Sequence, residues 1–187
     1  MAVDPRLVEL FSYYRDAELR GAELLLRLLS MMSDDAEATV NLTRHVADET
    51  KHAWLWTKRI TDMGGTPMRI AHGYQSRIGR RVVPRGMLDL LALTLVVEGR
   101  SLARYSEHAG RSDVDEATQR VLRAIVVDEE WHLRWMREKL DRLVEGDALA
   151  RGRVHDVSER YRRIDEEVYR DILSYEAETF SKSSSEG

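Results

Sequence analysis

The segment DETKH at residues 48–52 recurs as DEEWH at residues 128–132, so the pattern Asp-Glu-x-x-His occurs twice in the chain. A further glutamate precedes the glutamate of each copy by the same 31 residues, Glu18 before Glu49 and Glu98 before Glu129. No gap is needed to align the two halves around these residues. Internal symmetry of this kind indicates that the structure is built from two similar units.

Each of the four glutamates lies on an apolar stripe that steps by three or four residues, as the buried face of an amphipathic helix does. Four helices are predicted: one begins at Asp4-Pro5, one runs from about Asp34 to Gly64-Gly65, one runs from Pro84 to Gly110, and one runs from Asp113 to Val144. Capping residues and glycines mark their ends. We therefore predict an all-α fold, an antiparallel four-helix bundle over residues 1–146.

The stretch between Gly64 and Gly86 loses helical periodicity and is rich in glycine and proline. A long connection is unusual in a compact domain, except where the chain must run the length of a bundle before the next helix starts. We therefore predict a long crossover between helices 2 and 3. Residues 147–180 form an amphipathic segment, which predicts an additional C-terminal helix packed on the bundle or on a partner subunit. The polar residues 181–187 predict a disordered tail.

Composition excludes several classes of protein. The 187 residues suit one domain, and 43% apolar with 33% charged residues is typical of a globular protein. The chain has no cysteine, which excludes iron-sulfur clusters and cysteine-type zinc sites. A net charge of −4 argues against nucleic-acid binding by the whole surface. The longest apolar stretch, Met87 to Val97, contains Asp89 and is too short for a membrane span, so we expect a cytoplasmic protein with no membrane partner.

The repeated pattern has the chemistry of a metal site. Residues three apart share one face of a helix, so each Glu-x-x-His offers two ligands to one point. An ionised carboxylate inside a core costs several kcal/mol unless a nearby charge compensates it, and two divalent cations would supply that charge. Carboxylate and imidazole ligands suit iron or manganese. The candidate metal ligands are Glu18, Glu49, His52, Glu98, Glu129 and His132.

Asp48 and Asp128 directly precede the two motif glutamates. Histidines that bind metals commonly donate their second ring N–H to a carboxylate. We therefore hypothesise that Asp48 orients His132 and that Asp128 orients His52. The alternative is a plain bundle whose glutamates are solvated or paired with basic residues.

Three further features have both a functional and a structural interpretation. The crossover from Arg69 to Arg85 carries five arginines and no acidic residue, so it would either bind RNA or another anionic substrate or, as we favour, pin itself to acidic helix faces. Aromatic residues near the motifs are interpreted mainly as core, with electron transfer or the lining of a substrate cavity as the alternatives; they are Tyr14, Trp54, Trp56, Tyr105, Trp131 and Trp135. The remaining histidines are expected at the surface or in satisfied structural positions; they are His45, His72, His108 and His155.

Residues 5–144 resemble the ferritin-like superfamily, which includes ferritins, bacterioferritins, rubrerythrins and diiron hydroxylases. The resemblance implies two bound iron ions, with manganese as the alternative metal. It implies that Glu18 and Glu98 are terminal ligands, that Glu49 and Glu129 bridge the metals, and that the two motif histidines complete the coordination. The chain lacks the cysteines of a rubredoxin module, and Thr50 stands where bacterioferritins carry a haem-ligating methionine, so haem is not expected.

The string VVEGRSLARY at residues 96–105 also resembles a string in tRNA-modifying diiron hydroxylases. We therefore expect a non-haem diiron oxidoreductase that activates O2 or peroxide to hydroxylate an organic or tRNA-linked substrate. Such an enzyme would need an external electron donor, a separate reductase, and would be a monomer or homodimer. The alternatives are a ferritin-type protein that oxidises iron for storage or detoxification, and a metal-loaded bundle with a structural role.

Overall fold

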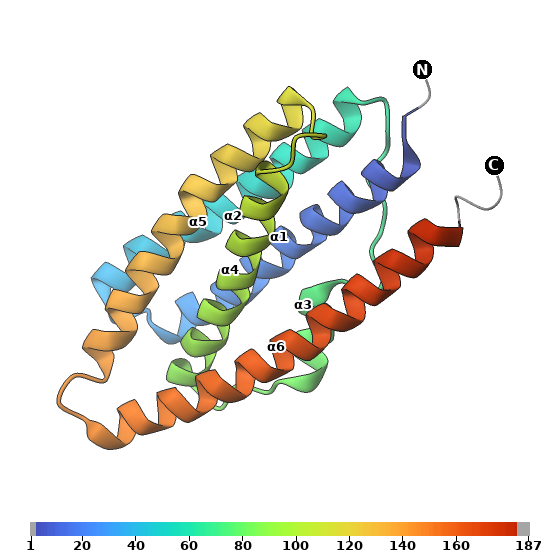
Figure 1. The fold of residues 1–187 in the computed structure, drawn as a ribbon. Coiled ribbons are helices and arrows are strands. Elements are labelled where there is room, and N and C mark those ends of the chain that lie inside the picture. Colours follow the sequence, from blue (N-terminus) through green and yellow to red (C-terminus); the bar gives the residue numbers. More distant parts are fainter. Residues whose placement is uncertain (1–2, 183–187) are drawn as a thin grey trace.

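The computed structural model describes residues 3–182, with side chains described up to residue 173. Within this range the chain forms six helices and no strands (Figure 1). The helices are α1 Pro5–Met31, α2 Ala36–Asp62, α3 Tyr74–Arg81, α4 Met87–Ala109, α5 Glu116–Leu143 and α6 Ala148–Lys182. The all-α prediction is confirmed. In the described part of the chain, no helix is both long and apolar enough to cross a membrane.

Aspartates cap three of the four bundle helices, and α4 begins after Gly86 instead. The caps of α2 and α5 lie one and two residues beyond the predicted Asp34 and Asp113. Asp4, Asp35 and Asp115 each accept a hydrogen bond from a backbone N–H in the first turn of α1, α2 and α5, at 2.9 to 3.0 Å. These bonds satisfy donors that a helix terminus leaves unpaired. Gly64 ends α2 with a φ of 83°, a left-handed conformation that glycine adopts without a steric penalty.

Two antiparallel helix pairs make the bundle. Helix α1 packs against α2, and α4 packs against α5, while α2–α5 and α1–α4 contacts join the pairs. The crossover between α2 and α4 runs along the bundle and contains the short helix α3 (Figure 1). Helix α3 was not predicted, because its eight residues lie beside several glycines and prolines and show no clear periodicity. Its buried Tyr74 and Ile78 lie one turn apart and pack in a third apolar cluster with residues of α4 and α6.

Helix α6 crosses α4 and α3 on one side of the bundle (Figure 1). Asp165 of α6 is 5% exposed and fixes this contact. Its Oδ1 accepts a hydrogen bond from the Tyr74 hydroxyl at 2.6 Å, and its Oδ2 accepts one from Arg100 Nη2 at 2.6 Å. Whether residues 147–180 also contact a partner subunit stays a prediction. Of the predicted tail, residues 183–187 lie outside the described part of the chain.

The bundle interior has a polar layer between two apolar clusters. Near one end, a cluster that includes Leu25, Leu42 and Met136 fills the core. Near the other end, a cluster of aromatic and aliphatic residues surrounds Trp56 and Tyr105. The glutamates of the repeat lie between these clusters on all four bundle helices, so the fold brings them to one level of the core.

Candidate metal centre

The structure brings the six predicted ligands together inside the bundle. Each is at most 3% exposed: Glu18, Glu49, His52, Glu98, Glu129 and His132. One residue comes from α1, one from α4, and two each from α2 and α5. The antiparallel pairing explains this convergence, because a separation of 31 residues places the two glutamates of each pair at the same height on adjacent helices.

Ligand atoms within 4.8 Å of one another form two groups that share Glu49. One group comprises Glu18, Glu49, His52 and Glu129, and the other comprises His45, Glu49, Glu98 and His132. Glu129 also spans the groups, since its Oε1 lies 3.7 Å from His52 Nδ1 and its Oε2 lies 3.4 Å from His132 Nδ1. The arrangement has two centres about which donor atoms gather.

His45 belongs to the second ligand group, although the sequence does not predict it as a ligand. We expected it at the surface or in a satisfied structural position, whereas its side chain is fully buried in the second group. Its ring stacks on that of His132, with centroids 3.5 Å apart and planes at 22°. It precedes Glu49 by four residues and therefore shares its helix face. That spacing was the available clue, but it has no counterpart in the second half of the chain.

Unpaired donor atoms show that the pocket suits cations. Buried polar atoms normally have hydrogen-bond partners. Five ligand atoms here have none: Nδ1 and Nε2 of His45, Oε1 of Glu49, Nδ1 of His52 and Oε1 of Glu129. A β-carbon at Gly21 of α1 would lie 2.4 Å from Glu49 Oε2, so this glycine leaves the space that the Glu49 carboxylate occupies. Carboxylate and imidazole donors aimed at a common point match iron or manganese.

Electrostatics also favour a bound positive charge. Burial, and then repulsion from Glu98 and Glu18, raise the pKa values of Glu49 and Glu129 well above the ordinary value. Burial also raises the pKa of Glu98, but the neighbouring His45 and His132 outweigh it, so the net pKa of Glu98 is lowered. Several carboxylates this close cannot all ionise without compensation. Cations at this level would remove the repulsion.

The outer ring nitrogens of both motif histidines face the aspartates of the opposite helix. His52 Nε2 lies 3.1 Å from Asp128 Oδ2, and His132 Nε2 lies 3.5 Å from Asp48 Oδ2. Each histidine thus directs Nδ1 toward the carboxylates and Nε2 toward an aspartate. The pKa of Asp128 is lowered, because Lys51 and His52 outweigh the effect of its partial burial. An ionised aspartate can accept the ring N–H and fix the orientation of the ring.

Aromatic residues enclose the other side of the centre. The buried Tyr105 hydroxyl donates a hydrogen bond to Glu18 Oε1. Tyr105 packs edge-on against Tyr14, whose hydroxyl lies 3.1 Å from His108 Nδ1. Tyr14, Tyr105 and Trp56 belong to one apolar core cluster, and Trp135, which lies near His45, belongs to the other. Trp54, in contrast, is 58% exposed and is not a core residue.

A family model described as a ferritin-like domain matches residues 39–145, which is more than half of the chain. The chain belongs to the ferritin-like family. Two of the similar solved structures are ferritins. Mycobacterium tuberculosis bacterioferritin BfrA has a TM-score of 0.63 at 22% identity, covering 82% of this chain and 96% of that chain. A dodecameric thioferritin, a bacterioferritin-related protein from Bacteroides fragilis, has a TM-score of 0.62 at 19% identity, covering 79% and 94%. No curated protein sequence was found to match.

These comparisons correct the expected activity. The prediction that this ferritin-like chain hydroxylates an organic or tRNA-linked substrate is wrong, because the family match and both similar structures favour the ferritin-type alternative. The string at residues 96–105 was the source of the error. In the structure its Glu98 lies in one of the two groups of candidate ligands, but its Arg100 pairs with Asp165 and so helps to hold α6 on the bundle.

The arginine-rich crossover of the ferritin-like chain makes structural contacts. Arg81 pairs with Glu167 at 3.3 Å and with Asp171 at 3.2 Å, both on α6. Arg77 and Arg80 donate hydrogen bonds to nearby backbone carbonyls. Arg81 therefore makes the contact with an acidic helix face that we favoured, whereas the bonds of Arg77 and Arg80 are local to the crossover. Binding of RNA or of another anionic substrate there stays a prediction.

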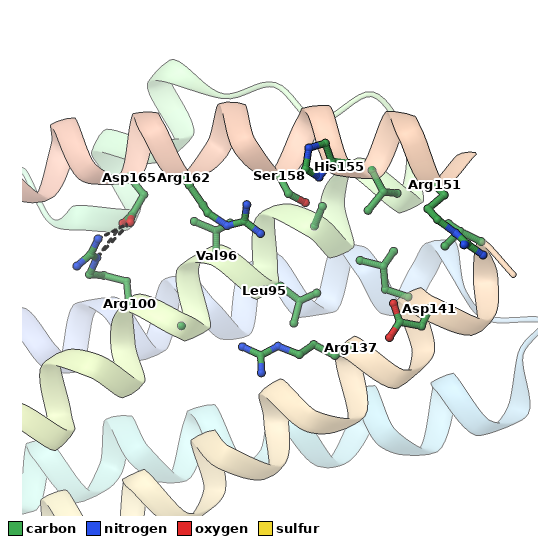
Figure 2. A pocket seen from close by; sticks show the side chains of 15 residues that line it. Leu95, Val96, Arg100, Arg137, Asp141, Arg151, His155, Ser158, Arg162 and Asp165 are labelled. Carbon is green, nitrogen blue, oxygen red and sulfur yellow. Dashed lines mark hydrogen bonds and ion pairs between the residues drawn. The ribbon is translucent and has the colours of Figure 1, made fainter. Parts of the chain in front are cut away.

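A cleft of about 530 Å³ lies between α4, α5 and α6 of the ferritin-like chain (Figure 2). The Arg100–Asp165 pair closes one end of it, and Arg137, Arg151 and Arg162 line its walls (Figure 2). None of the candidate metal ligands lines this cleft. It is therefore separate from the metal centre.

Proposed function

We propose that this chain binds two Fe²⁺ ions at the centre and oxidises them to Fe³⁺ with O2 or peroxide, for storage or detoxification of iron. The observation that carries the proposal is the convergence of buried carboxylate and imidazole atoms that lack hydrogen-bond partners. In a plain structural bundle each unpaired buried group destabilises the fold by about 1 to 3 kcal/mol, and here five such atoms gather at one level of the core. Membership of the ferritin-like family supports the same conclusion.

The geometry supports distinct roles for the carboxylates. Glu49 is shared by the two ligand groups, and the two oxygens of Glu129 face the two motif histidines, so these residues suit bridging positions. Glu18 and Glu98 each belong to one group only and suit terminal positions. Tyr105 holds one oxygen of Glu18 through its hydroxyl group and thereby limits the orientations of that carboxylate.

Iron supplies the redox chemistry, because each Fe²⁺ gives up one electron on oxidation. Two such electrons and two protons convert O2 to hydrogen peroxide, or convert one peroxide to two waters. Fe²⁺ is then both substrate and electron donor, so the separate reductase expected for a hydroxylase is not needed. Burial of the centre restricts access of water and strengthens the interaction of the carboxylates with cations.

Anaerobic loading with Fe²⁺ followed by exposure to O2 or peroxide tests the proposal. We expect two irons per chain and rapid oxidation of the bound iron, monitored by absorbance and oxygen consumption. Glu129→Gln should lose most of the binding and oxidation. Glu130→Gln is the matched control, because Glu130 is the exposed neighbour of Glu129 in the same motif. Fewer than one iron per wild-type chain under these conditions would contradict the proposal.

The assembly state separates storage from detoxification. A storage protein must enclose its iron in a shell of many copies, whereas oxidation alone needs only one chain or a small assembly. Sedimentation of the iron-loaded protein measures this. Iron that sediments with a large, closed particle supports storage; a monomer or homodimer that oxidises iron and releases it supports detoxification.

A further inference from the structure

His45 breaks the internal repeat at the centre. The residue four positions before Glu49 is His45, whereas the residue four positions before Glu129 is Ile125. Ile125 is fully buried in the apolar cluster around Trp56. The two halves of the chain therefore supply different side chains at equivalent positions, one imidazole and one hydrocarbon.

The contacts of His45 are those of a ligand rather than of a structural histidine. Its Nε2 lies 3.6 Å from Glu98 Oε1 and 3.7 Å from Glu49 Oε1, yet neither of its ring nitrogens makes a hydrogen bond. Its ring is held by packing, face to face with His132 and edge-on to Trp135, 6.0 Å between centroids. A fully buried imidazole with two unpaired nitrogens is unfavourable unless one of them binds a cation.

We propose that His45 is a third imidazole ligand and makes the two metal positions chemically unequal. The inference rests on the proposed metal centre and adds to it. Glu49 and Glu129 lie between the two positions. Beside them, one position has two imidazoles and one carboxylate, from His45, His132 and Glu98. The other position has one imidazole and one carboxylate of its own, from His52 and Glu18, so the two positions differ by the imidazole of His45.

Unequal donors imply unequal metal preferences. Imidazole nitrogen suits borderline cations such as Co²⁺ and Zn²⁺, whereas a carboxylate-rich site suits harder cations such as Mn²⁺. The position that contains His45 therefore binds Co²⁺ more tightly than its neighbour and keeps its ion while the carboxylate-rich position exchanges. A symmetric centre, with an apolar residue in place of His45, would lack this difference.

Titration of the metal-free full chain with Co²⁺, without oxygen, tests the inference. Calorimetry should resolve two binding steps in the wild type. His45→Gln should weaken the tighter step by at least about 10-fold, the lower end of the loss seen when only a supporting residue of a metal ligand is changed. The weaker step should stay within about twofold. His72→Gln, which removes an exposed histidine of the crossover, should leave both steps unchanged.

Proton NMR of the Co²⁺-loaded chain provides a readout that does not depend on affinity. Each coordinated imidazole gives an exchangeable ring N–H resonance that the paramagnetic ion shifts, so we expect three from the wild type and two from His45→Gln. Should His45→Gln fail to fold, His45→Ile is the second variant, because it installs the residue that the other half of the chain already carries.

The outcomes distinguish this inference from the proposed function. Two binding steps that are unchanged in His45→Gln, with two shifted resonances in both proteins, would overturn the role of His45 and leave the dimetal centre standing. A wild type that binds no Co²⁺ and no Fe²⁺ would overturn both. The inference is supported if His45→Gln loses the tighter binding step and one shifted resonance while His72→Gln keeps both binding steps.

Discussion

Gly21 shows how one absent side chain shapes the centre. A methyl group there would lie 2.4 Å from Glu49 Oε2, the carboxylate that both ligand groups share. We expect Gly21→Ala to weaken Co²⁺ binding by at least about 10-fold, because Glu49 must leave its bridging position. Stability should change little, since the end of a flexible side chain can move and alanine is favoured over glycine in a helix by about 1 kcal/mol. Calorimetry and urea unfolding measure the two effects.

Gly99→Ala is the matched control. Gly99 lies in the middle of α4 beside Glu98, and a β-carbon there meets no atom within 4 Å. This variant should gain the same helix propensity and keep wild-type metal binding. Equal binding by both alanine variants would show that the space at Gly21 has no part in placing Glu49.

The sequence predicts side chains at the centre only where the chain repeats itself. The two Asp-Glu-x-x-His motifs and their partner glutamates place six candidate ligands, and the structure collects all six. His45 has no partner in the repeat, because Ile125 fills the equivalent place, so no pattern separates it from an ordinary core or surface histidine. Its position becomes evident only when packing stacks it on His132.

At the scale of elements, the start of α5 depends on one carboxylate. Asp115 accepts hydrogen bonds from the backbone N–H and hydroxyl of Thr118, and it pairs with Arg59 of α2 at 2.8 Å. These contacts outweigh its slight burial and lower the pKa of Asp115 to about 2. A folded-state pKa below the unfolded value stabilises the fold above pH 4. That contribution is lost as the pH falls from about 4 to about 2.

Asp115→Ala should lower the free energy of unfolding by about 1 kcal/mol at pH 7, the usual loss for removal of an N-cap. The difference from the wild type should shrink as the pH falls below 4, because protonation then removes the same charge from the wild type. Asp115→Asn, which keeps the cap but not the charge, should lie between them at neutral pH. Urea unfolding followed by circular dichroism at several pH values measures this; a difference independent of pH would assign the effect to something other than ionisation.

Element boundaries were predictable where capping residues mark them and less so elsewhere. The aspartates before α1, α2 and α5 and the glycines after α2 and α4 gave boundaries within a few residues. Helix α3 was not predictable in this way, because its few apolar residues are buried by α4 and α6. Its stability depends on this tertiary contact rather than on local helix preference. The same contact joins Tyr74 and Arg100 to Asp165, three residues far apart in the sequence.

For the whole molecule, the bundle and the level of its polar layer follow from the repeat, but the activity does not. An iron oxidase and a hydroxylase require the same buried carboxylates and imidazoles, so ligand spacing alone could not separate them. The family match and the two similar ferritin structures favour the ferritin-type alternative, and the oxidation of iron by this chain is our proposal. What the centre does with oxygen depends on access and on cavity shape, which arise from packing over the entire bundle.

Metal binding should stabilise the whole chain, because repulsion among the carboxylates is built into the metal-free core. The raised pKa values of Glu49 and Glu129 show that burial and repulsion disfavour their ionised forms when no metal is bound. Free Co²⁺ at 100 times its dissociation constant adds about 2.7 kcal/mol per site. That gain corresponds to a rise in melting temperature of about 5 to 11 °C per occupied site for a chain of this size.

Differential scanning calorimetry should show the rise in the wild type and in Glu130→Gln, and a chelator should reverse it. Glu129→Gln should melt higher than the wild type without metal, because it removes a carboxyl group whose protonation in the core costs free energy at neutral pH. This variant should respond little to Co²⁺. A wild type whose melting temperature is the same with and without Co²⁺ would mean that the polar layer does not bind the metal in the folded state.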